Sequence, residues 1–63
     1  MKRQALLRWQ HGDQVVLVEL DGTDLVISLK EDGVVQATLA LPASRSLLIG
    51  LREACIQALR GMQ

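Results

Sequence analysis

Residues 15–30 read VVLVELDGTDLVISLK, and this stretch decides the fold. Two β-branched runs of strand length flank a Gly/Asp cluster at residues 21–24, which is typical of a tight hairpin turn. A turn at residues 22–23 places three pairs of apolar residues opposite each other. These pairs are Leu20 with Leu25, Val18 with Ile27, and Val16 with Leu29. A slip of one residue would turn every side chain to the other face, so this agreement fixes the register.

The preceding turn extends the same face to an earlier strand. Gly12-Asp13 has glycine first, which is the pattern of a two-residue type II′ turn. With that turn, the strand before it contributes three further apolar residues to the face. The expected pairs are Trp9 with Val16, Leu7 with Val18, and Ala5 with Leu20.

The third turn, near residues 31–33, is more ambiguous. A two-residue turn at Asp32-Gly33 would place Leu29 opposite Gln36 and so mix apolar with polar residues. A three-residue loop, Glu31-Asp32-Gly33 with a left-handed Gly33, keeps the face apolar. We therefore expect the three-residue loop, which pairs Leu29 with Val35, Ile27 with Ala37, and Leu25 with Leu39.

The predicted sheet thus has one wholly apolar face and one mixed face, over strands at residues 5–10, 15–20, 25–30 and 34–39. The apolar face comprises Ala5, Leu7, Trp9, Val16, Val18, Leu20, Leu25, Ile27, Leu29, Val35, Ala37 and Leu39. The mixed face comprises Leu6, Arg8, Gln10, Val15, Leu17, Glu19, Val26, Ser28, Lys30, Val34, Gln36 and Thr38.

A helix is expected over residues 45–60. Pro42 ends the fourth strand, because it has no amide hydrogen for the ladder. Ser44 is suited to cap the helix, Gly61 to stop it, and Arg60 to interact with the dipole of its last turn.

The expected helix is more apolar than a cover for one sheet requires, since its apolar arc spans roughly 220° of the helical wheel. One stripe contains Leu47, Leu48, Leu51, Ala54, Cys55, Ala58, Leu59 and Met62, and Ile49 and Ile56 lie beyond Arg52. In so short a chain, the simplest second cover is another copy of the protein. The candidate self-association residues are Leu47, Ile49, Ile56 and Leu59.

Two residues of the expected helix each have more than one explanation. Gly50 is explained by a kink, by a close helix approach, or by simple tolerance on the polar side. Arg45 opposes the helix dipole, which reflects either an interaction or solvent exposure.

The length of the chain limits it to one α+β domain over residues 1–63. The predicted fold is a four-stranded antiparallel β-meander with a C-terminal helix packed on one sheet face (ββββα). This domain is expected to form a homodimer. A domain of this size buries only about 60% of its unfolded surface. Seven basic and seven acidic side chains cancel, so no net charge repels a second copy or attracts nucleic acid or membrane.

No residue pattern predicts catalysis. The single histidine, His11, lies in an expected turn without a second ligand, and the single cysteine, Cys55, falls in the helix stripe as a small buried hydrophobe. Phosphate-binding, EF-hand and nucleophile-elbow motifs are absent from the sequence. We therefore expect no enzyme activity, catalytic residue, cofactor, metal or small-molecule substrate. With neither a signal-like nor a membrane-spanning run, the default expectation is a cytoplasmic protein without membrane contact.

The mixed sheet face suggests a second class of function. Arg8 and Lys30 lie on it, and Lys2 and Gln4 would extend it, so this candidate nucleic-acid face could follow a phosphate backbone. Two features oppose that hypothesis. Glu19 shares the face, and the only aromatic residue, Trp9, points to the helix side, where it cannot stack on bases.

The order of elements over residues 5–60 resembles that of the PC4-like family of single-stranded DNA-binding coactivators. The resemblance implies a homodimer built largely through helices, with curved sheets that hold nucleic acid. Ser44-Arg45-Ser46-Leu47 lacks the acidic and Trp residues with which the family's helix typically opens. No site residue is therefore transferred.

Two hypotheses about function follow. The first is a non-enzymatic, homodimeric interaction or accessory module, whose surplus apolar surface meets a second copy. The alternative is a single-stranded nucleic-acid-binding dimer of PC4-like topology. The sequence identifies neither a pathway nor the symmetry of the oligomer.

Overall fold

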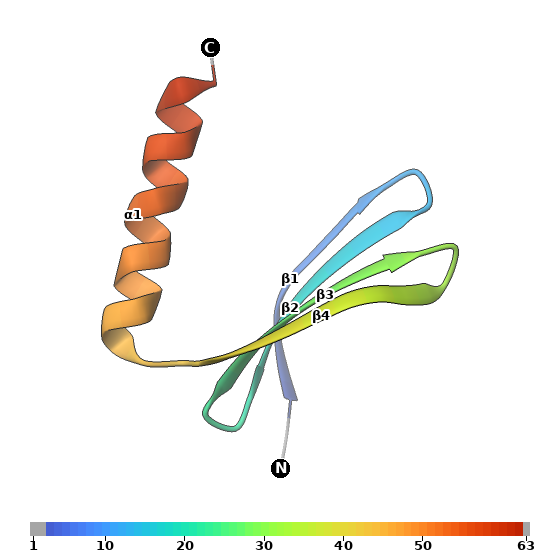
Figure 1. Cartoon of the computed structure of the whole chain (residues 1–63), viewed down its shortest axis with the longest axis horizontal. Helices are drawn as coiled ribbons and strands as arrows, with labels where there is room; N and C mark the ends of the chain where they lie inside the picture. Colours follow the sequence, from blue (N-terminus) through green and yellow to red (C-terminus); the bar gives the residue numbers. More distant parts are fainter. Residues whose placement is uncertain (1–2, 63) are drawn as a thin grey trace.

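Four antiparallel strands in one sheet precede a single C-terminal helix, as the sequence predicts. The computed structural model describes residues 3–62 of the chain. The sheet is strongly twisted, with its strands in sequence order (Figure 1). The elements are β1 (Arg3–His11), β2 (Gln14–Asp21), β3 (Asp24–Glu31), β4 (Val34–Pro42) and α1 (Arg45–Gly61).

The two hairpins on either side of β2 have the predicted turns. His11 pairs with Gln14, so Gly12 and Asp13 form a two-residue loop in which Gly12 has a φ of 60°. This left-handed first position is the feature of a type II′ turn that favours glycine. The predicted pairs across β2 and β3 are confirmed, namely Leu20 with Leu25, Val18 with Ile27, and Val16 with Leu29.

The third turn differs from the prediction, because it is the two-residue Asp32-Gly33 turn that we set aside. Glu31 pairs with Val34, and both turn residues have positive φ, 53° for Asp32 and 76° for Gly33. Asp-Gly is a preferred pair for this type I′ geometry. The three-residue loop was wrong, and so were its cross-strand partners.

A bulge in β4 restores the apolar face after that turn. The register shifts between Leu29 and Lys30, so Lys30 pairs with Val35 whereas Leu29 pairs with Ala37. Gln36 is the extra residue, and such an insertion shifts all later positions by one. The observed apolar pairs are therefore Leu29 with Ala37, Ile27 with Leu39, and Leu25 with Leu41. Val35, expected on the apolar face, lies instead opposite Lys30 of the mixed face.

A second irregularity lies in β1 and corrects another prediction. Trp9 pairs with Val16 and Leu7 with Val18, as expected, but Ala5 pairs with Glu19 rather than with Leu20. Leu6 is the extra residue here. The residues of β1 before Leu6 therefore lie on the opposite faces from those predicted. Gln4, predicted to extend the mixed face, lies opposite Leu20 on the apolar face.

Hydrogen bonds outside the ladder tie the two ends of the sheet. At one end, the amide of Asp32 donates to the carbonyl of Asp13 at 3.1 Å, which joins the tips of two hairpins. At the other end, the amide of Ala43 donates to the carbonyl of Thr23 at 2.8 Å. The second bond fixes the chain as it leaves β4 for the helix.

The helix has the predicted N-cap. The Ser44 hydroxyl accepts a hydrogen bond from the Leu47 amide at 3.2 Å, which satisfies one of the free donors of the first turn. At the other end, the Met62 amide donates to the carbonyl of Leu59. The helix therefore includes Gly61, one residue beyond the predicted end.

The helix does not cover the sheet of its own chain, which corrects the predicted packing. Within residues 3–62, the extensive contacts between elements join neighbouring strands, and α1 stands apart from the sheet (Figure 1). The radius of gyration is 13.0 Å, whereas a compact domain of this length has a value of about 10.6 Å. The chain is thus an open arrangement of a sheet and a helix.

Burial is correspondingly sparse. Among the described residues, Leu25 is the only buried hydrophobic side chain, with 4% of its surface exposed. Its partners Leu20 and Leu41 are half-buried, as is Ala43, where the chain leaves the sheet. The interior of the isolated chain is therefore a small cluster at one end of the sheet.

Two glycine substitutions should have effects of opposite sign on stability. Gly33→Ala should lower the free energy of unfolding by about 1–2 kcal/mol, because alanine is strained at the positive φ of the I′ turn. Gly50→Ala should raise it by up to about 1 kcal/mol, because a Cβ there meets nothing within 4 Å and alanine favours the helix. Urea unfolding at one protein concentration measures both. A neutral Gly33→Ala would contradict the I′ turn.

Candidate self-association surface

One face of the sheet is apolar over most of its length, with Gln4 at one end of it, and no element within residues 3–62 covers it. We call it the apolar sheet face. It comprises Leu7, Trp9, Val16, Val18, Leu20, Leu25, Ile27, Leu29, Ala37, Leu39 and Leu41. The central strands shield one another in part, but on the edge strands Leu39 is 53% exposed and Leu7 is similarly exposed. Monomeric soluble proteins rarely expose a continuous apolar surface of this extent.

Trp9 belongs to this face, as predicted, but it is not in a core. Its side chain is 46% exposed. The ring stacks on His11, with the ring centroids 5.8 Å apart and an interplanar angle of 23°. His11, expected as an exposed turn histidine, is indeed exposed, and it ends β1 beside the first turn. The Trp9–His11 pair therefore extends the apolar sheet face towards the hairpin tips.

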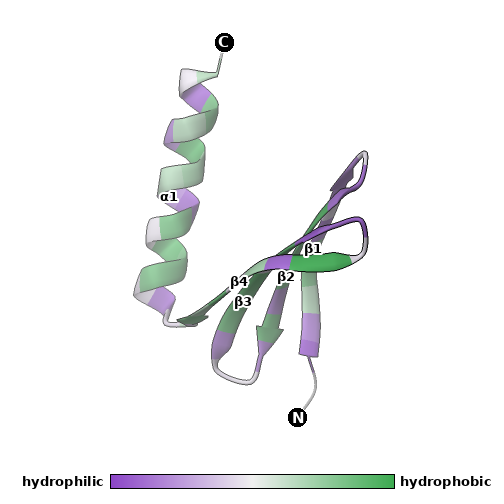
Figure 2. Cartoon of the chain, turned by 45° about the vertical axis from the view of Figure 1, so that its right-hand side comes forward, coloured by the Kyte–Doolittle hydropathy of each residue, from purple (hydrophilic) through white to green (hydrophobic). Residues whose placement is uncertain are grey.

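The helix carries a second uncovered apolar surface. We call the predicted set of residues the helix stripe: Leu47, Leu48, Leu51, Ala54, Cys55, Ala58, Leu59 and Met62. Only Leu47 and Leu51 are half-buried, and the other members are exposed, with Leu59 at 68%. Figure 2 shows hydrophobic residues recurring along α1, between hydrophilic ones, and along the strands, whereas hydrophilic residues gather toward the hairpin ends of the strands.

Cys55 illustrates the consequence of the open arrangement. The sequence predicted a buried cysteine, but Cys55 is a free and exposed thiol, because no element of its own chain covers that side of α1. The prediction of its place on the helix stripe stands, and the prediction of its burial was wrong.

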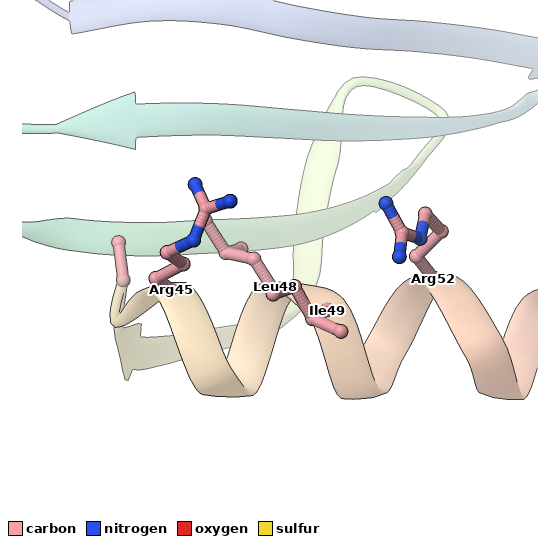
Figure 3. A pocket seen from close by; sticks show the side chains of 5 residues that line it. Arg45, Leu48, Ile49 and Arg52 are labelled. Atoms are coloured by element: carbon pink, nitrogen blue, oxygen red, sulfur yellow. The ribbon is translucent and has the colours of Figure 1, made fainter.

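The four predicted self-association residues lie on two sides of the helix. Leu47 and Leu59 belong to the helix stripe, and Ile49 and Ile56 are moderately exposed on the flank beyond Arg52. Ile49 also lines an open hollow at the start of α1, with Ala43, Arg45, Leu48 and Arg52. Figure 3 shows the Arg45 and Arg52 side chains pointing to the same side of the helix. Arg52 pairs with Glu53 at 3.2 Å.

The mixed sheet face retains Arg8 and Lys30 but balances them with acidic residues. Arg8 lies opposite Leu17, and its guanidinium donates to the Gln10 side chain at 3.2 Å. Arg3 lies opposite Asp21, and it pairs with Asp21 at 3.3 Å and with Glu19 at 3.7 Å. Lys2, the third residue of the predicted nucleic-acid face, lies outside the described residues.

The described residues offer little for other kinds of site. Between residues 3 and 62, no three His, Cys, Asp or Glu side chains come together as metal ligands would. In the same part of the chain, no helix has the length and apolar character needed to cross a membrane. The apolar surfaces are therefore the feature of the structure with the clearest functional meaning.

Comparison with family models, curated proteins and solved structures gives no match to this chain.

The single tryptophan offers a direct probe of the apolar sheet face. If a second copy covers this face, the fluorescence emission of Trp9 should shift to shorter wavelength as protein concentration rises, because water is removed from the indole. Quenching by acrylamide should fall over the same range. Emission and quenching that stay constant from nanomolar to high micromolar concentration, at values typical of an exposed indole, would contradict cover of this face.

Proposed function

We propose that this chain is the subunit of a homodimer that acts as a non-enzymatic interaction module. The observation that carries the proposal is an excess of exposed surface. The chain has 5154 Å² of accessible surface at a mass of 6.9 kDa. A compact monomer of that mass exposes about 4,000 Å². The difference is about 1,150 Å² for each copy.

That excess matches what a stable dimer buries. A typical specific interface removes about 800 Å² from each partner, and obligate homodimers bury more than 2,000 Å² in total. Two copies that each lost about 1,150 Å² would bury about 2,300 Å², within the obligate class. The interface would also be mostly apolar, as expected when a dimer contact replaces a missing domain core.

The charge of the chain supports the same conclusion. Seven basic and seven acidic residues cancel, so two copies approach without net repulsion. The exposed side chains of Leu7, Trp9, Leu39, Leu48, Leu59 and Met62 lie on the apolar sheet face and the helix stripe, whereas the ion pairs of Arg3 lie on the mixed face. A second copy can therefore cover apolar surface without burying these charges, which would be costly.

Binding of single-stranded nucleic acid is the weaker alternative. Arg8 and Lys30 share the mixed face, but Glu19 and Asp21 lie on that face too, and both are engaged by Arg3. Its only candidate stacking residue, Trp9, lies on the opposite face. A surface that binds single strands normally combines a positive groove with aromatic platforms. These placements favour self-association over nucleic-acid binding.

A charge on the helix stripe should disrupt the dimer without damaging the monomer. Leu59→Glu should raise the dimer dissociation constant at least about tenfold, a cost of about 1.4 kcal/mol or more, because association would bury an unpaired carboxylate. Leu59 is largely exposed in the single chain, so the substitution removes little monomer packing. Size-exclusion chromatography with light scattering across a dilution series gives the constant.

Gln57→Glu is the matched control, since it adds the same charge two residues away, outside the helix stripe. It should leave the dissociation constant within about threefold of the unmodified chain, as surface changes usually do. Equal dissociation constants for the Leu59→Glu, Gln57→Glu and unmodified chains would exclude the helix stripe from the interface.

A further inference from the structure

The connection between β4 and α1 determines where the helix can go. Only Ala43 and Ser44 separate the two elements. The Ala43 amide is held by the Thr23 carbonyl at 2.8 Å, and Ser44 is extended, with φ −80° and ψ 151°. Ser44 also caps the helix, so its conformation is fixed from both sides. The helix therefore starts at the end of the sheet and stands to one side of it, separated from the strands (Figure 1).

This geometry leaves two complementary apolar surfaces on one chain. The 17 residues of α1 span about 25 Å at 1.5 Å per residue. The strands have 8 or 9 residues, which corresponds to about 26–31 Å at 3.2–3.4 Å per residue. The helix stripe is thus about as long as the apolar sheet face that it would cover.

We infer that the two copies exchange helices: α1 of each copy lies on the apolar sheet face of the other. The inference rests on the proposed homodimer and specifies its interface. Exchange covers both apolar surfaces with one kind of contact, the helix stripe on the apolar sheet face. Two-fold symmetry repeats this contact in the dimer. A contact between two apolar sheet faces would leave both helix stripes in water, and a contact between two helices would leave both sheets uncovered. Exchange keeps the β4–α1 connection unchanged.

The exchange brings the helix stripe of one copy against the apolar sheet face of the other. Cys55 is the eleventh of the 17 helix residues and belongs to the helix stripe. Ala37 lies on the apolar sheet face opposite Leu29, near the middle of the edge strand β4. Cys55 of one copy therefore lies over the face that contains Ala37 of the other copy. Ser28, opposite Leu17 and Thr38, lies on the mixed face and is shielded from that helix by the sheet itself.

Crosslinking between two distinguishable chains tests this arrangement. One chain keeps Cys55 and carries a tag that changes its mass. The other carries Cys55→Ser together with Ala37→Cys, and the two are unfolded, mixed and refolded together. A short bis-maleimide should then join the two different chains, because the thiols lie on facing surfaces. The matched control carries Cys55→Ser with Ser28→Cys, and it should lose the mixed-chain product.

The outcomes separate the inference from the proposed function. A mixed-chain product with Ala37→Cys but not with Ser28→Cys supports exchange. A dimer by light scattering that gives no mixed-chain product with Ala37→Cys, or an equal one with Ser28→Cys, overturns exchange and leaves the homodimer standing. A mixture that stays monomeric at high micromolar concentration overturns the homodimer, and the exchange with it.

Two further variants test whether a negative result reflects a variant that does not fold, and whether a crosslink forms within one chain. Val18→Cys, at the centre of the apolar sheet face, replaces Ala37→Cys if circular dichroism shows that the latter does not fold. A single chain that keeps Cys55 and carries Ala37→Cys should give no intramolecular crosslink when refolded at nanomolar concentration. An efficient intramolecular crosslink there would mean that the helix covers its own sheet, and it would overturn the exchange.

Discussion

No element within residues 3–62 covers the apolar face of the sheet, and the other features of the molecule depend on this constraint. Hydrophobic burial is the main favourable term in folding, and a chain of 63 residues has little apolar surface to bury beyond what folding needs. Here the sheet and the helix each leave an apolar surface in water, and among residues 3–62 only Leu25 is buried. A monomer with this architecture forgoes much of the burial that its sequence could provide. In the homodimer that we propose, a second copy supplies the missing layer and converts two open surfaces into one core.

The sequence was sufficient to predict the meander, its faces and the helix, because alternation and turn chemistry agree along the chain. It was not sufficient to predict the exact register at Leu6 and Gln36. At Gln36 the chain satisfies a local preference and then corrects it with a bulge, since Asp32-Gly33 adopts its favoured two-residue turn and Gln36 restores the face afterwards. Register arguments that assume uninterrupted strands place Val35 and Ala5 on the wrong face, because they forbid that correction.

The sequence predicted most of the residues that make up the candidate self-association surface, but not where the helix lies relative to the sheet. The width of the apolar arc on α1 and the apolar position of Trp9 followed from periodicity alone. The separation of helix and sheet did not, because it depends on two residues, Ala43 and Ser44, whose hydrogen bonds set the direction of the chain. Cys55 was therefore expected inside a core that the single chain does not form. The surplus of apolar residues on the helix was nevertheless the signal that pointed to a second copy.

The mass of the chain in solution distinguishes a dimer from a monomer most directly. Sedimentation equilibrium of the unmodified chain at micromolar concentration should give twice the chain mass of 6.9 kDa, with dissociation only on dilution. A single species of 6.9 kDa that stays folded by circular dichroism across that range would contradict it, because the apolar sheet face and the helix stripe would then be stable in water without a partner.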